Sequence, residues 1–132
     1  YSFSKKGVIR GLHYQLPPCA QGKLVSVMKG KVWDVAVDIR KDSKTFGQWV
    51  GVELSEENNL SFYIPPGFAH GFSVLSEEAH FFYKCTSEYS KLHERGLRFD
   101  DNDLNIDWKV SNPIISSKDE EYPGIKDIET FE

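Results

Sequence analysis

The amino-acid sequence predicts a single all-β domain, in which the strands form a sandwich, a jelly roll or a small barrel. The chain has 132 residues, a length that suits one domain with one hydrophobic core. Before residue 100, about eight short apolar or alternating segments are separated by turn residues at intervals of roughly 8–12 residues. None of these segments has the period of an amphipathic helix, so we expect strands to form the regular structure.

The first strand pattern carries two polar residues that could have a function. Arg10 and His13 lie in a short apolar run that a Pro-Pro turn ends, and Lys23 opens the next strand. We expect the two strands to form a hairpin whose guanidinium, imidazole and ammonium groups suit an anionic ligand. Gly11, inside the run, indicates a bulge or a close backbone approach. From these residues alone, an ordinary hairpin with three solvated side chains explains the pattern equally well.

A second hairpin is expected around Gly30, because residues 24–28 and 32–39 are both rich in β-branched side chains. In the second of these strands the odd positions are apolar. Asp34 and Asp38 occupy even positions, so both carboxylates are predicted to lie on the opposite face of the sheet.

Further strand patterns cover residues 47–54, 62–65, 72–75 and 80–85. In the last of these, Phe81, Tyr83 and Cys85 fall on one side. The chain changes character after residue 100, where an acidic segment precedes Trp108, which we expect to anchor the C-terminal part. Ser117 stands three residues before Glu120, a spacing typical of a capped helical turn.

Composition excludes several classes of protein. The net charge of −4 and the lack of a basic run argue against nucleic-acid binding. No apolar run has membrane-spanning length, and no signal-peptide pattern opens the chain. Cys19 and Cys85 form neither a CxxC motif nor a disulfide framework, so we expect a reduced, cytoplasmic protein with structural thiols, although pairing of the two remains open.

The motifs favour acid–base chemistry over other reactions. His13 is followed by Tyr14 and Gln15, so the His-x-His pair and the glutamate of metal-binding barrels are both missing, and no metal is expected. The chain has neither a Gly-x-Ser-x-Gly elbow nor a phosphate-binding glycine loop. His70 follows a rigid Pro-Pro-Gly turn, and taken alone it is better interpreted as a half-buried histidine bonded to backbone. His93 lies in a charged segment that we expect to be a loop.

Six segments of the sequence together resemble the dTDP-4-dehydrorhamnose 3,5-epimerase family, and the likeness extends from about Lys6 to Asp119. The segments are IRGLHYQ at 9–15, QGK at 21–23, VWDVAVD at 32–38, FGQWVG at 46–51, IPPGFAHGF at 64–72 and FYK at 82–84. Six blocks in the same order and at matching spacings are far more specific than any one motif.

The resemblance implies a cupin-type jelly-roll β-barrel that acts as a homodimer and needs neither a metal nor another cofactor. The implied reaction converts dTDP-4-dehydro-6-deoxy-D-glucose to dTDP-4-dehydro-L-rhamnose through an enolate. By position, His13 is the general base, Tyr83 the general acid, Asp119 the carboxylate paired with the base, and Lys23 the group that stabilises the enolate oxygen. The implied substrate-binding residues are Arg10, His70, Tyr89, Glu94 and Lys118.

The sequence also departs from the family pattern. Members carry an N-terminal segment that helps to hold the nucleotide and exchanges between subunits, and the single domain at 1–132 is expected to lack it. Two alternatives therefore stay open. One is an epimerase that inverts a single carbon of a related dTDP-4-ketosugar, and the other is a non-catalytic cupin that binds sugar nucleotides.

Overall fold

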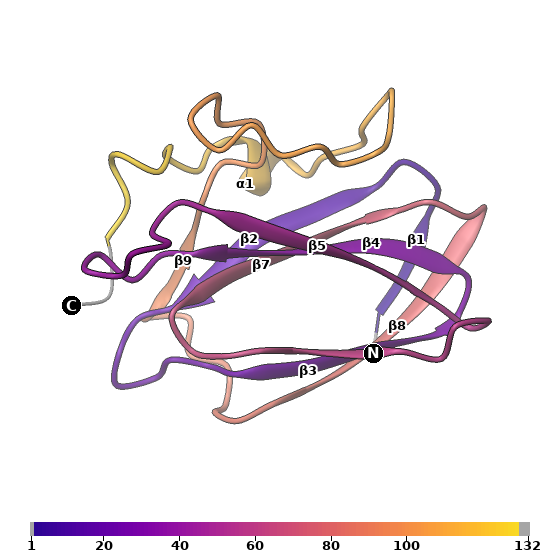
Figure 1. Cartoon of the computed structure of the whole chain (residues 1–132), viewed down its shortest axis with the longest axis horizontal. Helices are drawn as coiled ribbons and strands as arrows, with labels where there is room; N and C mark the ends of the chain where they lie inside the picture. The colour runs from indigo at the N-terminus through magenta and orange to yellow at the C-terminus, as the bar shows by residue number, and fades with distance from the viewer. Residues whose placement is uncertain (1, 130–132) are drawn as a thin grey trace.

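In the computed structural model, which describes residues 2–129, the chain forms nine β-strands and one short helix. Residue 1 and residues 130–132 of the single domain expected at 1–132 lie outside the described part. The strands form two antiparallel sheets stacked face to face, which is the all-β jelly-roll architecture predicted from the sequence (Figure 1).

One sheet has four strands in the order β1-β8-β3-β6, and the other has five in the order β5-β4-β7-β2-β9. The four-stranded sheet comprises β1 (Ser2–Lys5), β8 (Glu78–Cys85), β3 (Lys23–Lys29) and β6 (Ser61–Ile64). The five-stranded sheet comprises β5 (Trp49–Ser55), β4 (Lys31–Asp38), β7 (Phe68–Val74), β2 (Ile9–Gln15) and β9 (Glu94–Gly96).

The two hairpins expected from the sequence are wrong, although the strands themselves are present. Strand β3 pairs with β6 and β8, whereas β2 and β4 belong to the opposite sheet. The turn at Gly30 therefore carries the chain from one sheet to the other. A period of two shows that a strand has an apolar face, but it does not show which strand is its neighbour. Here Val25 of β3 and Val32 of β4 belong to the same apolar cluster between the two sheets.

Two apolar layers hold the fold together. The first fills the space between the sheets, with side chains from β3 to β8. The second lies on the outer face of the five-stranded sheet, where the C-terminal segment covers it. The predicted split of β4 is confirmed, because Val35 and Val37 pack in the outer layer. Asp34, of the opposite parity, is fully buried on the inner side, next to His70 of the neighbouring strand.

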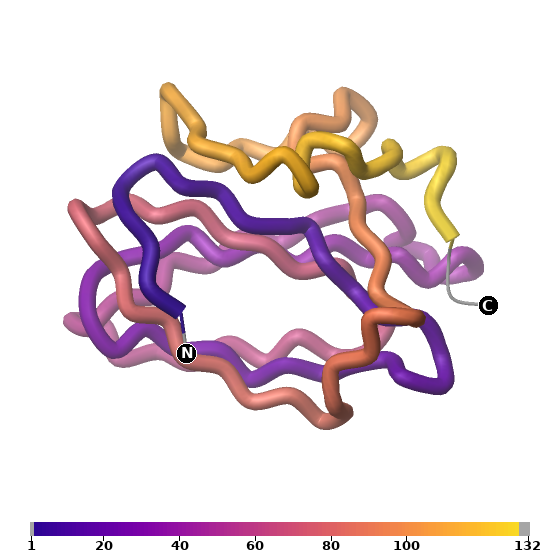
Figure 2. The backbone as a smooth tube through the Cα atoms, turned by 180° about the vertical axis from the view of Figure 1, so that it is seen from behind, coloured from indigo at the N-terminus to yellow at the C-terminus, as the bar shows by residue number. Residues whose placement is uncertain are grey.

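The C-terminal segment, coloured orange to yellow, crosses the five-stranded sheet in both views (Figures 1 and 2). Trp108 anchors it as predicted, since the side chain is buried and Nε1–H donates to the Phe99 carbonyl at 2.8 Å. The helical turn α1 (Ser117–Glu120) is capped one residue earlier than expected, because the Ser116 hydroxyl accepts from the Asp119 N–H.

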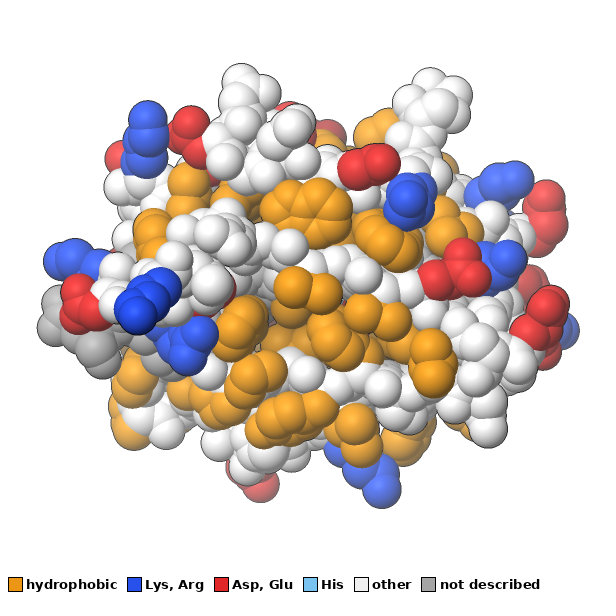
Figure 3. Space-filling view, viewed as in Figure 1, with side chains coloured by type: hydrophobic (Ala, Val, Ile, Leu, Met, Phe, Trp, Pro, Cys, Tyr) orange, Lys and Arg blue, Asp and Glu red, His pale blue; other side chains and the backbone are white. Residues whose placement is uncertain are grey.

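The surface of the molecule is not uniformly polar. Figure 3 shows hydrophobic side chains gathered across the middle of the viewed face, with most charged side chains toward its margin. Among the described residues, no helix has both the length and the apolar character needed to cross a membrane.

Candidate active site

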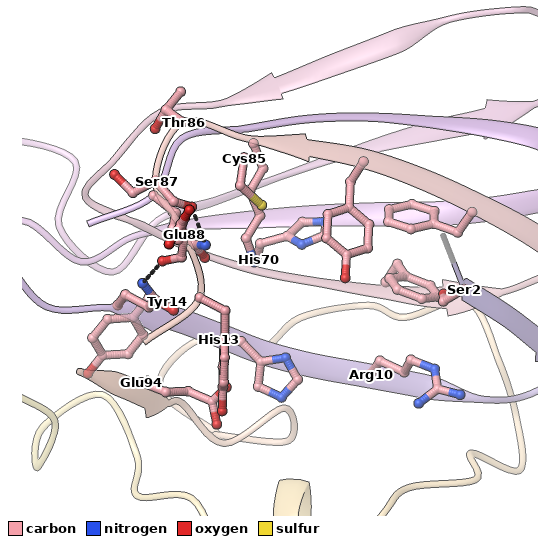
Figure 4. A pocket seen from close by; sticks show the side chains of 17 residues that line it. Ser2, Arg10, His13, Tyr14, His70, Cys85, Thr86, Ser87, Glu88 and Glu94 are labelled. Atoms are coloured by element: carbon pink, nitrogen blue, oxygen red, sulfur yellow. Dashed lines mark hydrogen bonds between the residues drawn. The ribbon is translucent and has the colours of Figure 1, made fainter. Parts of the chain in front are cut away.

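A cavity of about 650 Å³ lies between the two sheets, within the size range of small-molecule sites (Figure 4). Its walls come from strands of both sheets and from the loop at 86–89. Seven of the nine residues predicted for the site line it: Arg10, His13, Lys23, His70, Tyr83, Tyr89 and Glu94. The other two, Lys118 and Asp119, are hydrogen-bonded to residues of this set.

His13 on β2 and Asp119 on α1 form a hydrogen-bonded pair at one wall. His13 Nε2 lies 2.8 Å from one carboxylate oxygen of Asp119, and the other oxygen accepts from the Gly11 N–H at 3.1 Å. Burial opposes ionisation of Asp119, but its hydrogen bonds and the nearby imidazole outweigh burial and lower the pKa of the carboxyl. An ionised Asp119 can only accept, so Nε2 carries the proton and Nδ1 is the basic nitrogen of His13.

An irregularity in β2 brings Arg10 and His13 into the same cavity. Residues three positions apart face opposite sides of a regular strand. The register with β7 shifts between these two residues, and both side chains line the cavity. Gly11, at the shift, has a φ of +117°, and a Cβ there would lie 2.7 Å from the His70 carbonyl oxygen. The bulge and close approach predicted at this glycine are therefore confirmed.

The facing wall belongs to the four-stranded sheet and carries Lys23 and Tyr83. Lys23 begins β3, opposite Cys85 of β8, and Tyr83 lies two residues before Cys85 on the same side of β8. Burial lowers the pKa of the Lys23 ammonium, and negative groups, including Asp34 and Glu94, offset part of that effect. A cation and a phenol thus face the His13 imidazole from the other sheet.

His70 and Asp34 form a second pair, deeper between the sheets. His70 Nε2 lies 2.6 Å from an Asp34 carboxylate oxygen, and both residues are buried. The backbone partner expected for His70 is therefore wrong, because a neighbouring strand supplies a carboxylate instead. Burial lowers the pKa of His70 and raises that of Asp34, and each partner opposes the shift of the other. At neutral pH we therefore expect the His70 imidazole to be uncharged.

The rim of the cavity carries charged and aromatic groups. The Lys118 ammonium donates to the Glu94 carboxylate. Burial opposes ionisation of Glu94, but Lys118 holds the pKa of that carboxyl below its usual range. Tyr89 is 61% exposed at this rim, and Arg10 Nε donates to the Ser4 hydroxyl at 2.9 Å. The rim thus offers an aromatic face and several polar groups to a long ligand.

Comparison with known proteins agrees with this geometry. The family model described as dTDP-4-dehydrorhamnose 3,5-epimerase matches residues 1–127. The chain belongs to this family. A curated dTDP-4-dehydrorhamnose 3,5-epimerase from Shigella flexneri is 61% identical over 119 residues, which are 90% of this chain and 66% of the relative. The chain thus spans about two thirds of that relative's length.

Solved structures of the epimerase family superpose closely on the fold. A crystal structure of dTDP-4-dehydrorhamnose 3,5-epimerase from Elizabethkingia anophelis has a TM-score of 0.94 and 55% identity, and the match covers 96% of this chain and 70% of that one. A crystal structure of dTDP-6-deoxy-D-glucose-3,5-epimerase from Legionella pneumophila, in complex with dTDP-4-keto-L-rhamnose, has a TM-score of 0.93 and 53% identity. The match covers 97% of this chain and 68% of that one.

The sequence did not point to every residue at this epimerase-family site. The alternation in β4 predicts the face on which Asp34 lies, but only the pairing of β4 with β7 brings it to His70. The sequence predicts a structural thiol at Cys85, but this residue is exposed and lines the cavity. Both cysteines are free, which settles the open question of pairing. Tyr122 was not singled out, because only the folded C-terminal segment places it beside His13.

Within residues 2–129, no group of three or more His, Cys, Asp or Glu side chains is arranged to hold a metal ion. Gln15, which stands where a metal-binding barrel would carry a ligand, instead bonds the Cys19 and Glu88 carbonyls and accepts from the Ser90 N–H. These bonds hold the loop that forms one lip of the cavity.

Proposed function

We propose that the protein is a dTDP-4-dehydrorhamnose 3,5-epimerase, which inverts C3 and C5 of dTDP-4-dehydro-6-deoxy-D-glucose to give dTDP-4-dehydro-L-rhamnose. One observation carries this proposal: the His13–Asp119 pair and the Tyr83 phenol approach the cavity from opposite sheets. Inversion at carbon requires proton removal on one face and delivery on the other, and this arrangement provides a group for each face.

The first half of each inversion is removal of a proton next to the C4 ketone. His13 Nδ1 accepts the proton, the C–H electron pair forms the C=C bond of an enolate, and the carbonyl electrons move onto O4. Asp119 stabilises the imidazolium that forms and fixes the tautomer beforehand. Lys23, on the facing wall of the cavity, stabilises the negative charge on O4.

The second half is protonation of the enolate carbon from the opposite face. Tyr83 donates its phenolic proton, the C=C electrons form the new C–H bond, and the C4 carbonyl is restored. A positioned acid or base typically accelerates a reaction by about a hundredfold to ten-thousandfold. Repeating the sequence at C3 and C5 gives the double epimer, and proton exchange with solvent resets both residues.

The rim residues suit the nucleotide end of the substrate. Tyr89 presents an exposed ring for stacking on a base, while Arg10 supplies a guanidinium for a phosphate group. Lys118 and Glu94 hold each other in place and offer further polar contacts. We therefore assign these residues, with His70, to substrate binding.

We also infer that the protein acts as a homodimer through the outer face of the four-stranded sheet. This face carries large apolar side chains that are between 37% and 64% exposed: Leu24, Met28, Tyr63 and Phe82. The outer face of the other sheet is covered by the C-terminal segment, whereas no described segment covers this one. We propose that a second copy of the chain covers this face. Light scattering tests the proposal, because the Leu24→Asp variant should be monomeric.

Proton NMR of the 4-dehydro-6-deoxy sugar nucleotide in deuterated water tests the activity. Deuterium entering at both C3 and C5 supports the double epimerase, and deuterium at a single carbon supports the one-carbon alternative. Binding of the nucleotide sugar without exchange would favour the non-catalytic cupin. His13→Asn should abolish exchange, while His80→Asn, on β8 and outside the cavity lining, should retain it.

A further inference from the structure

Tyr122 packs against the imidazole that the proposed mechanism uses as its base. The two ring centroids lie 5.7 Å apart, and the ring planes are close to perpendicular, at 81°. This edge-to-face geometry is a favoured contact between aromatic rings. Tyr122 stands three residues after Asp119, so the same C-terminal segment brings both side chains to His13.

The Tyr122 ring occupies a slot that a glycine leaves open. Gly96 of β9 is the cross-strand partner of His13, and cross-strand partners project their side chains on the same face. A Cβ on Gly96 would lie 2.2–2.3 Å from Cζ, Cδ1 and Cδ2 of Tyr122. These three atoms alternate around the ring, so the ring lies flat over the Gly96 α-carbon. Tyr122 therefore fills the space beside His13 that a side chain at position 96 would otherwise occupy.

We propose that Tyr122 is a positioning residue that holds the His13 imidazole in its working orientation. The proposal rests on the proposed function, in which His13 is the base. Asp119 fixes the ring through a single hydrogen bond at Nε2, about which an imidazole can still swing. The Tyr122 ring, seated on Gly96, blocks that motion from one side and keeps Nδ1 aimed at the substrate carbon.

The contribution of Tyr122 is steric. Its hydroxyl oxygen is buried, and the cation that acts on it is Lys118, whose ammonium donates to Glu94. Burial raises the pKa of the phenol, so the side chain is uncharged at neutral pH. The charged or titratable groups that act on His13 are instead Asp119, Glu94 and His70. The ring alone should therefore suffice, and phenylalanine should replace tyrosine.

Steady-state kinetics of two variants test this directly. Tyr122→Ala should lower kcat by about tenfold to a hundredfold, the loss expected when a reacting group is displaced by about an ångström. KM should change far less, because Tyr122 does not line the cavity. Tyr122→Phe should keep the wild-type kcat, since it retains the ring.

Gly96→Ala is an independent way to displace the Tyr122 ring and, with it, the His13 imidazole. Its added methyl group would meet the Tyr122 ring, and the φ of Gly96 is outside the left-handed region, so alanine suits the backbone. Gly96→Ala alone should lower kcat as Tyr122→Ala does. In the Tyr122→Ala background, the same change should have no further effect. This non-additivity is the signature of a direct coupling between the two positions.

NMR signals of the His13 ring provide a measurement that does not depend on turnover. The Cε1–H and Cδ2–H resonances should shift in Tyr122→Ala and Gly96→Ala, and should stay close to wild type in Tyr122→Phe. Shifted signals in a protein without epimerase activity would support the positioning role and count against the proposed function. Unshifted signals in folded Tyr122→Ala, or a kcat within about twofold of wild type, would overturn the inference.

Discussion

Replacing Asp119 by asparagine should slow the reaction by about a thousandfold. The two oxygens of Asp119 accept from His13 Nε2 and from the Gly11 N–H, and asparagine has only one acceptor oxygen for these two donors. If that oxygen stays on Gly11, the amide NH₂ faces His13. Nε2 must then accept a hydrogen bond, the ring proton moves to Nδ1, and the base is lost.

The magnitude follows from two contributions. A hydrogen bond to a charged group contributes about 1.5–3 kcal/mol. Because about 1.4 kcal/mol corresponds to a factor of ten in rate, losing the charge beside the imidazolium alone slows proton removal by about tenfold to a hundredfold. The unfavourable tautomer accounts for the remainder, since only a minor fraction of molecules would carry a free Nδ1.

The assay is the rate of deuterium incorporation at C3 and C5, compared with the matched variant Glu120→Gln. That variant removes one negative charge from the next position of the same helical turn, but Glu120 is exposed and should not affect the rate. Asp119→Asn should remain folded, as judged by thermal denaturation. An exchange rate within about threefold of wild type in folded Asp119→Asn would refute the assignment of Asp119 to the base.

Three further results are expected. Lys23→Gln should reduce the exchange rate by about a hundredfold to a thousandfold, whereas Lys84→Gln, outside the cavity lining, should not; equal rates would exclude Lys23 from stabilising O4. Gly11→Ala should lose roughly 1–3 kcal/mol of stability in urea denaturation, because its methyl group meets backbone at 2.7 Å; an unchanged midpoint would contradict the close approach. Asp119 has a lowered pKa in the folded state, so its contribution to stability is present above about pH 4 and is lost as the pH falls. The difference in unfolding free energy between wild type and Asp119→Asn should therefore become smaller in acid. A difference that does not change with pH would show that the Asp119 carboxylate does not stabilise the fold.

Strand positions could be predicted from the sequence because each main strand carries its own alternation or apolar run. Partners could not be predicted, since that alternation fits a hairpin and a crossing between sheets equally well. The sequence pattern does not predict strands β1 and β9, for another reason. The residues of β9, Glu94 to Gly96, include no large apolar side chain, and the strand forms at a sheet edge by backbone pairing with Tyr14 and its neighbours on β2.

Some contacts of the site, like some features of the fold, could not be predicted from local sequence. The pairing of His13 with Asp119 was anticipated from family resemblance, and the structure brings the two side chains into contact across 106 residues of sequence. Nothing local to either residue encodes that contact. The sequence does not indicate the role of Tyr122 for a similar reason. That role depends on Gly96, which has no side chain and lies in β9, part of a segment that the sequence predicts to be a loop.

The origin of Asp119 in the C-terminal segment has a consequence for how activity appears during folding. The barrel supplies His13, Lys23 and Tyr83, but the carboxylate arrives only when the last quarter of the chain docks on the outer sheet. A chain that ends after Trp108, whether nascent or clipped by a protease, would lack Asp119 and with it the carboxylate that orients His13. In the proposed mechanism, turnover therefore requires the docked C-terminal segment, and a chain without Asp119 would leave the sugar nucleotide unaltered.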